Sequence, residues 1–141
     1  MKRKGSAFWK GGLKDGKGTV STQSGVLKDA QYSFGTRFES GTGTNPEELI
    51  AAAHAGCFSM ALSLILGEAG LKAERINTTA TVSLEQQDGG FAITAVYLDV
   101  SAKIPGADPQ SFEKATDAAK AGCPVSKLLN AKISMDAKLE A

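Results

Sequence analysis

Cys57 and Cys123 are the residues of this chain with the most distinctive chemistry. Cys57 lies in a run of apolar and small residues, and Cys123 stands between a glycine and a proline. A thiolate can attack a peroxide or a disulfide, and two cysteines in a reducing compartment are more often a transient redox pair than a permanent crosslink. The pair therefore predicts thiol redox chemistry. The alternative for Cys57 is an inert buried cysteine, and the alternative for Cys123 is a cysteine at a helix terminus that has no role.

Arg37 and Glu47 are the groups that could assist a thiolate. Arg37 is one of only three arginines among the 16 basic residues. A fixed guanidinium stabilises a thiolate and can hold a peroxide oxygen as negative charge develops on it. Glu47 could anchor this cation, because Glu48 is already explained by a helix-capping box. The alternative is a cation on a strand surface that pairs with Glu39.

The spacing along one predicted helix limits how these groups can meet. Glu47 and Cys57 are separated by roughly 15 Å along a straight helix, so one arginine cannot reach both within a subunit. The helix is also apolar on nearly every face, and one small domain has difficulty covering it. Two copies crossing antiparallel near Ala52 would bring Glu47 of one beside Cys57 of the other. A sharp kink at Gly56 is the rival explanation.

Three other patterns are interpreted without a catalytic role. Gly11–Lys17 nearly matches a phosphate-binding loop, but Gly18 replaces the required Ser or Thr, so a hairpin turn is expected. His54 precedes Cys57 by one helical turn, yet no third residue completes a hydrolase site, which favours a satisfied or interface histidine. Two cysteines and one histidine at these spacings do not make a zinc site.

The elements that must position these residues are strands first and helices later. Turn residues and alternating apolar residues predict strands at 8–9, 19–22, 32–38, 76–84, 96–104 and 133–139, with Arg37 in the third and a bulge near Ala95. Asn45 and Pro46 open a helix that runs to about Glu68, and further helical segments are expected at 108–121 and 125–130. The order β-β-β-α-β-β-α-β predicts an α+β fold.

Composition narrows the classes of protein further. A chain of 141 residues is expected to form a single domain, residues 1–141, and its net charge of +1 disfavours binding to nucleic acid or anionic lipid. The apolar stretch Leu49–Leu66 is interrupted by polar residues, so we expect a buried helix of a soluble protein and no membrane span. The N-terminus shows no secretory pattern, which predicts a cytoplasmic location.

Three segments carry a resemblance to a known family. They are Thr44–Leu49, Ala53–Ser63 and Ala121–Ser126, and they are similar to the osmotically inducible protein C (OsmC) family over the whole chain. The Thr36–Phe38 context looks more like the OsmC branch than its organic hydroperoxide resistance (Ohr) sister. The resemblance implies a single OsmC-like domain in an intertwined homodimer, with antiparallel β-sheets wrapped around two long central helices.

The same resemblance implies a function. It is that of a thiol-dependent peroxidase that reduces organic hydroperoxides in oxidative and osmotic stress defence. By resemblance, Cys57 is the peroxidatic cysteine, Cys123 resolves its sulfenic acid into a disulfide, and Arg37 and Glu47 assist. No cofactor or metal is expected, and the reductant would be an external dithiol, such as a lipoyl group or lipoylated protein. The alternative is a non-catalytic ligand-binding or redox-sensing module with an apolar pocket.

Overall fold

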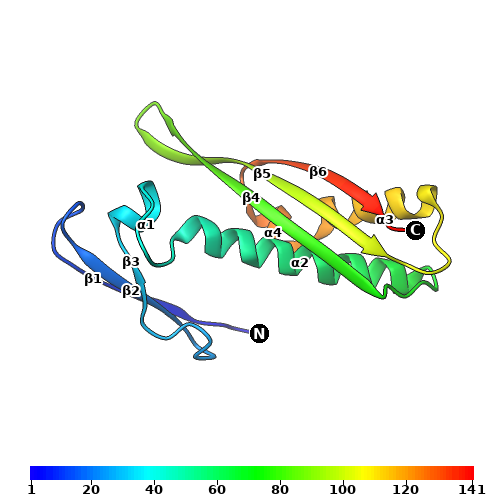
Figure 1. Cartoon of the computed structure of the whole chain (residues 1–141), viewed down its shortest axis with the longest axis horizontal. Helices are drawn as coiled ribbons and strands as arrows, with labels where there is room; N and C mark the ends of the chain where they lie inside the picture. Colours follow the sequence, from blue (N-terminus) through cyan, green and yellow to red (C-terminus); the bar gives the residue numbers. More distant parts are fainter. The chain divides into compact units, whose positions relative to one another are not determined.

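The N-terminal residues form a three-stranded antiparallel sheet followed by a short helix. The computed structural model describes residues 1–141, which divide into two compact units, Met1–Leu49 and Ile50–Ala141. The first unit holds β1 (Gly5–Lys10), β2 (Lys17–Thr22), β3 (Ala30–Tyr32) and α1 (Phe34–Phe38), with the strands in the order β1-β2-β3 (Figure 1). The single-domain expectation stays a prediction.

The segment that resembles a phosphate-binding loop is a hairpin turn, as expected. It joins β1 to β2, whose strands pair antiparallel from Gly5 with Thr22 to Lys10 with Lys17. Gly11 has a φ of 96°, and the backbone N–H of Gly16 donates to the carbonyl of Gly12 at 2.9 Å. A left-handed backbone conformation favours glycine, which explains the glycines here without any phosphate.

Helix α1 corrects the prediction that a third strand runs from 32 to 38. Strand β3 ends at Tyr32, and the chain turns into a helix because Ser33 and Thr36 form a capping box. The Ser33 hydroxyl accepts from the Thr36 amide at 3.3 Å, and the Thr36 hydroxyl accepts from the Ser33 amide at 2.8 Å. Arg37 therefore lies in a helix and not in a strand.

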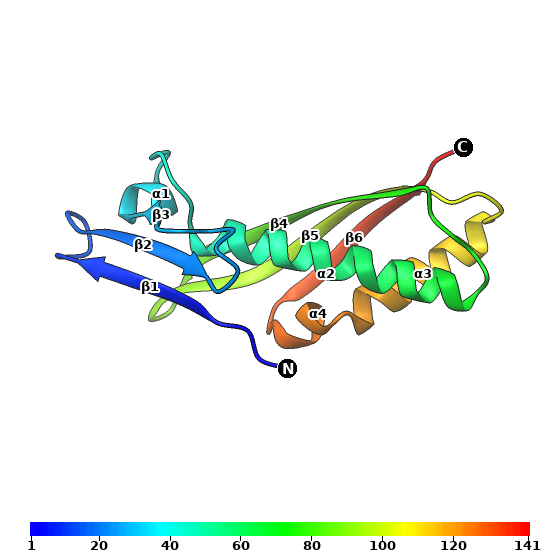
Figure 2. The ribbon, with the colours of Figure 1, turned by 90° about the horizontal axis from the view of Figure 1, so that it is seen from below.

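Helix α2 (Pro46–Glu68) follows the prediction at both ends. The Asn45 side chain accepts from the Glu48 amide at 2.8 Å, which satisfies one of the free N–H groups of the first turn. At the other end Gly70 adopts a φ of 76°, where glycine is favoured. The helix continues across Gly56 without interruption (Figure 2), which gives no support to a sharp kink there.

The second unit is built on a sheet with the strand order β4-β5-β6. Strands β4 (Arg75–Gln87) and β5 (Gly90–Lys103) form an antiparallel hairpin that contains the strand expected at 76–84 and, except for its last residue, the strand expected at 96–104. Ser83 pairs with Ala95 and Leu84 pairs with Ile93, so the register shifts by one residue. The predicted bulge near Ala95 is confirmed.

Strand β6 (Lys132–Leu139) corrects the expectation of purely antiparallel sheets. It pairs with β5 in parallel, so the second sheet is mixed. Helices α3 (Pro109–Gly122) and α4 (Pro124–Leu128) make up the crossover between β5 and β6. A crossover of this length returns the chain to the end of the sheet where β5 began, and a strand that starts there must run parallel to it.

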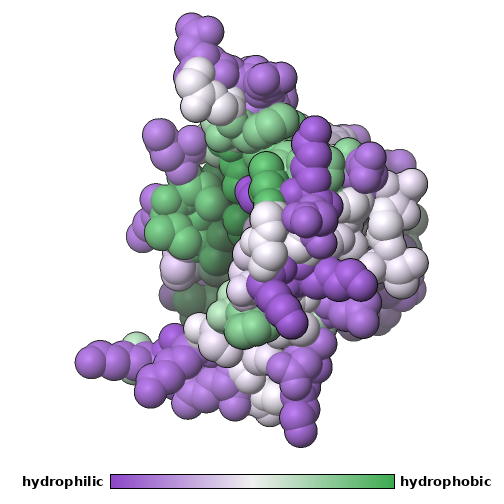
Figure 3. All heavy atoms as spheres, turned by 90° about the vertical axis from the view of Figure 1, so that its left-hand side faces the viewer, coloured by the Kyte–Doolittle hydropathy of each residue, from purple (hydrophilic) through white to green (hydrophobic).

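The core of the second unit lies between the sheet and the helices on one of its faces (Figure 2). Its buried members come from α2 (Phe58, Leu62, Leu66), from β5 (Val96, Leu98, Val100, Ala102) and from α3 (Phe112, Ala115, Ala119). The opposite face of α2 is open, because Met60 is 77% and Leu64 is 65% exposed. Figure 3 shows hydrophobic side chains gathered on a surface open to solvent.

The expectation of a buried α2 is thus correct for one face only. By length and composition α2 is also the one helix that could cross a membrane, a test that the core helix of a soluble protein passes too. Only 22% of its most apolar window is buried within the chain. An exposed apolar helix face of this kind calls for a partner surface.

Candidate active site

The two thiols lie close together. Cys57 is on α2 and partly exposed, whereas Cys123 is fully buried between α3 and α4. Cys57 packs against the buried cluster that contains Cys123, and both the Cys123 thiol and the Val125 backbone are near enough to influence the pKa of Cys57. Both cysteines are free thiols. The folding of the second unit therefore brings together two sulfur atoms that are far apart along the chain.

The surroundings of Cys57 in the second unit oppose its ionisation. Burial raises the pKa of the Cys57 thiol above its usual value, and the Cys123 thiol raises it further by hydrogen bonding and by charge. The Val125 backbone acts in the other direction and lowers this pKa. None of these causes is a cation, so a thiolate at Cys57 needs positive charge from elsewhere.

Cys123 occupies the expected helix break and links two helices. Its backbone N–H donates to the carbonyl of Ala119 at 3.0 Å and closes α3, while its sulfur accepts from the Ser126 amide at 3.4 Å and caps α4. Pro124 suits the first position of α4 because that position needs no backbone donor. The sulfur is thereby held toward the first turn of a five-residue helix.

A chain of buried hydrogen-bonded side chains connects Cys123 to α2. The Cys123 sulfur lies 3.1 Å from the Ser126 hydroxyl, which lies 2.7 Å from Nε2 of His54. His54 is fully buried, and this burial lowers its pKa. Its Nδ1 atom has no hydrogen-bond partner. The expectation of a satisfied histidine is therefore correct for one ring nitrogen only.

Ser126 is the residue of this site that sequence reasoning missed. A signal was available, since Ser126 stands three residues after Cys123, the spacing at which a capping side chain meets a backbone amide. The link to His54 spans 72 positions and has no local signature.

Arg37 and Glu47 form the expected ion pair inside the first unit. The Nε atom of Arg37 donates to Oε1 of Glu47 at 2.9 Å, and Glu47 is only 8% exposed. The Asn45 side chain donates to the carbonyl of Thr36 at 3.1 Å, which ties α1 to the start of α2. The alternative pairing of Arg37 with Glu39 is not formed.

A small cavity of the first unit is lined by Arg37. Its volume is about 200 Å³, and its other lining residues are mostly aromatic or apolar: Trp9, Leu13, Tyr32, Ser33, Phe34 and Phe38. The Arg37 guanidinium also lies 5.4 Å from the centre of the Phe38 ring. A cation on an apolar wall could bind a molecule that has a polar end and an organic body.

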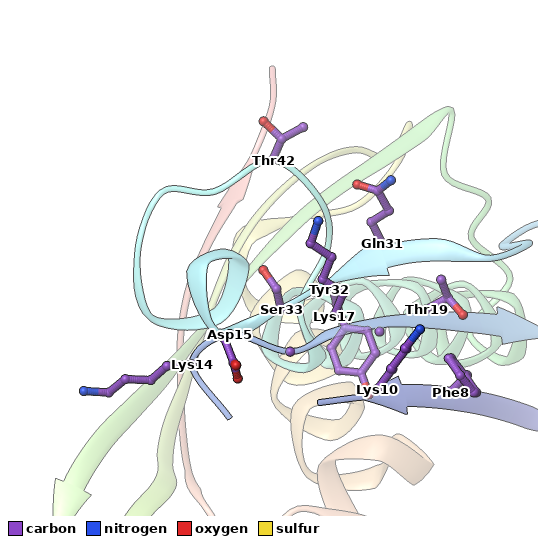
Figure 4. Close-up of a pocket in the computed structure, with 12 residues that line it drawn as sticks. Phe8, Lys10, Lys14, Asp15, Lys17, Thr19, Gln31, Tyr32, Ser33 and Thr42 are labelled. Atoms are coloured by element: carbon purple, nitrogen blue, oxygen red, sulfur yellow. The ribbon is translucent and has the colours of Figure 1, made fainter. Parts of the chain in front are cut away.

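A larger cavity, of about 480 Å³, lies on the same sheet (Figure 4). Lys10, Lys14 and Lys17 line it together with Phe8 and Tyr32. It contains neither cysteine, and no group of three or more His, Cys, Asp or Glu side chains in the chain could hold a metal ion. We assign it no part in the thiol chemistry.

Comparison with protein families assigns the chain to one of them. The model of the family described as OsmC-like protein matches residues 39–138, which include both cysteines, Glu47 and the His54–Ser126 pair. This chain is a member of the OsmC-like family. The match begins two residues after Arg37, so the arginine lies outside the matched segment.

Individual relatives of this OsmC-like protein agree with that membership. This chain is 57% identical over 138 residues to peroxiredoxin OsmC of Escherichia coli (strain K12), and the match covers 98% of this chain and 96% of the relative. It is 33% identical over 124 residues to the organic hydroperoxide resistance protein OhrB of Bacillus subtilis (strain 168), covering 87% and 88%.

A solved structure supports the fold. The crystal structure of OhrB of Bacillus subtilis superposes with a TM-score of 0.72 at 28% sequence identity, covering 97% of this chain and 98% of that one. The mixed α+β fold, with two three-stranded sheets, is therefore that of the OsmC and Ohr proteins.

Proposed function

We propose that this OsmC-like protein is a thiol-dependent peroxidase that reduces organic hydroperoxides to alcohols through Cys57 and Cys123. The proximity of the two free thiols is the observation that carries the proposal. Relatives named peroxiredoxin OsmC and organic hydroperoxide resistance protein support the peroxidase class. A role in defence against oxidative and osmotic stress, in the cytoplasm, fits this activity.

The reaction oxidises the two cysteines in two steps, and a dithiol then reduces them. The Cys57 thiolate attacks the outer peroxide oxygen, the O–O bond breaks, and the leaving alkoxide takes up a proton as the alcohol. Cys57 is then a sulfenic acid. The Cys123 thiolate attacks that sulfur, the S–O bond breaks, and hydroxide leaves and is protonated to water. An external dithiol, such as a lipoyl group, reopens the disulfide by exchange and is oxidised in its place.

Arg37 is assigned the positive charge that Cys57 lacks in its own unit. Burial raises the pKa of Cys57, and a guanidinium beside the sulfur would favour the thiolate and the developing alkoxide. Glu47 anchors the guanidinium through the 2.9 Å ion pair. The aromatic residues around Arg37 offer an apolar surface to the organic part of the peroxide.

A homodimer is the proposed assembly. The exposed Met60 and Leu64 leave one face of α2 uncovered, and a second copy would bring an identical apolar face. Two central α2 helices would then lie inside an intertwined dimer. Composite sites, with Arg37 and Glu47 of one subunit beside Cys57 of the other, are the arrangement that we propose.

Turnover separates a peroxidase from a passive binding or redox-sensing module. Wild-type protein with cumene hydroperoxide and dihydrolipoamide should consume peroxide much faster than the dithiol alone, and Cys57→Ser should remove this acceleration. Mass mapping after one equivalent of peroxide should find Cys57 linked to Cys123 within one chain. Loss of peroxide at the rate of free dithiol would show a binding module.

A further inference from the structure

His54 is a buried polar group that the proposed peroxidase chemistry does not use. It is fully buried on a mainly apolar helix, and one hydrogen bond, to Ser126, is the only polar contact of its ring. Burial of an imidazole with half of its hydrogen bonding unmet costs free energy. A neutral ring limits that cost, which agrees with the lowered pKa of His54.

The partners of His54 assign the direction of its hydrogen bond. A neutral imidazole has one N–H, on either Nδ1 or Nε2. Nδ1 is buried without a partner, and an orphaned buried N–H is rarer in proteins than an acceptor without a donor. The proton therefore belongs on Nε2, which donates to the Ser126 hydroxyl at 2.7 Å.

This direction determines what Ser126 presents to the sulfur. With its oxygen accepting from His54, the hydroxyl hydrogen of Ser126 points to the Cys123 sulfur at 3.1 Å. The backbone N–H of Ser126 donates to the same sulfur at 3.4 Å. Two donors of one residue thus converge on Cys123, and one of them is oriented and polarised by a buried imidazole.

We propose that His54 and Ser126 form a donor relay that stabilises the thiolate of Cys123, as positioning residues for both the closing and the reopening of the disulfide. The proposal rests on the proposed redox pair of Cys57 and Cys123. Hydrogen bonds to an ionised acceptor are about twice as strong as those between neutral groups, so the relay favours the thiolate over the thiol.

In disulfide closure the relay supports the attacking sulfur. Cys123 releases its proton to solvent, and its thiolate attacks the sulfur of the Cys57 sulfenic acid. The S–O bond breaks, the hydroxide takes up a proton, and one disulfide and one water result. The proton lost by Cys123 balances the proton gained by hydroxide, so His54 stays neutral throughout.

In reopening the relay supports the leaving sulfur. Cys57 is partly exposed and Cys123 is fully buried, so an external dithiol attacks the Cys57 sulfur. The Cys57–Cys123 bond breaks, and Cys123 leaves as a thiolate toward the two Ser126 donors. A better stabilised leaving thiolate departs faster. A second thiolate of the dithiol then displaces Cys57, which completes the oxidation of the dithiol.

Disulfide exchange tests the relay without any peroxide. The protein is oxidised with diamide, and the rate of reopening by dihydrolipoamide is measured for wild type, His54→Leu and Ser126→Ala. Each variant should reopen about tenfold more slowly, the effect of one hydrogen bond to a charged group. The double variant should be no slower than either single variant, because both changes break the same relay.

Two further variants separate a relay from a structural role. His54→Gln retains a side-chain N–H near the position of Nε2, and it should recover most of the rate that His54→Leu loses. Thr116→Val removes another buried hydroxyl, bonded only to the backbone carbonyls of Phe112 and Glu113, and it should reopen like wild type. A mixed disulfide trapped with a monothiol should be found on Cys57.

The outcomes are decisive. Wild-type rates in Ser126→Ala, which keeps the cap from its backbone amide, would overturn the relay even if His54→Leu failed to fold. Equal rates in His54→Gln and His54→Leu, or a mixed disulfide on Cys123, would also overturn it. If wild type forms the disulfide with diamide but consumes no cumene hydroperoxide, the peroxidase proposal fails while the relay is still measured.

Discussion

The two units of this chain hold complementary halves of the proposed chemistry. The first unit, Met1–Leu49, contains the Arg37–Glu47 ion pair and its aromatic cavity but no cysteine. The second unit, Ile50–Ala141, contains both thiols and the His54–Ser126 pair. The groups that set the pKa of Cys57 there include no cation. In the mechanism that we propose, activation and resolution of the sulfur thus belong to separate units of the chain.

The units also differ in how they are stabilised. All of the buried hydrophobic residues lie between Phe58 and Cys123, within the second unit. The first unit buries Thr36 and Glu47 but no hydrophobic side chain, and it exposes Phe8 of β1 and Leu13 of the turn that follows β1. A three-stranded sheet without a core of its own needs an apolar surface to pack against. The dimer that we propose would supply such a surface.

Among changes outside the two cysteines, removal of the positive charge in the first unit should have the largest effect on turnover. Arg37→Ala should lower kcat/KM for cumene hydroperoxide by about 10² to 10³, because a positive charge at the thiolate and alkoxide is lost. Arg75→Ala is the matched control. Arg75 also forms an ion pair, with Glu140 at 2.7 Å, but both residues belong to the second unit. Equal activities of the two variants would remove Arg37 from the mechanism.

Mixed dimers show whether the two halves meet across subunits. Subunits carrying Arg37→Ala are refolded together with subunits carrying Cys57→Ser. In a composite arrangement each mixed dimer keeps one intact site, so activity should return to as much as half that of wild type. No recovery in verified mixed dimers would place Arg37 and Cys57 of one site in the same subunit.

Cys123→Ser sharpens the description of the second unit. It should consume one peroxide per site and then stall or become over-oxidised, because the resolving thiol is gone. It should also lower the pKa of Cys57, since Cys123 raises that pKa while the effect of burial is retained. Alkylation of Cys57 measured against pH should therefore shift to lower pH. An unchanged profile would contradict the contact between the two sulfurs.

The smallest effect concerns stability against pH. Burial lowers the pKa of His54 below 6.5, so the contribution of the neutral ring to the free energy of unfolding is fully present above pH 6.5. As the pH falls below 6.5, the unfolded chain takes up a proton that the folded chain resists, and the free energy of unfolding decreases. Chemical denaturation at several pH values should show this slope in wild type and a shallower one in His54→Gln.

Asp108 provides an internal reference for that measurement. Hydrogen bonds from Ser111 hold the pKa of Asp108 below its usual 3.8, so its contribution is lost only in more acidic solution. The loss of the Asp108 contribution begins at lower pH than that of His54, because the ordinary pKa values of the two groups are 3.8 and 6.5. A slope between pH 6.5 and 5 that is the same in wild type and in His54→Gln would contradict burial of a neutral imidazole.

Local patterns predicted much of the fold because their causes are local. Asn45, Pro46 and Gly70 bound α2 through capping and backbone preference, and the turn at Gly11–Gly16 follows from its glycines. Helix α1 was missed because five residues are too short to show a helical period. Its only signal was the spacing of Ser33 and Thr36, in which threonine replaces the usual Glu or Gln.

The amino-acid sequence by itself determined which side chains can do chemistry, because residue type sets nucleophilicity, charge and hydrogen-bonding capacity. It also determined the main helix, through caps that act within one turn. Only the tertiary structure decided that Cys57 lies against Cys123 and that His54 reaches Ser126. Such contacts join distant segments, and they depend on how α2, α3 and α4 pack on one mixed sheet, which no local pattern encodes.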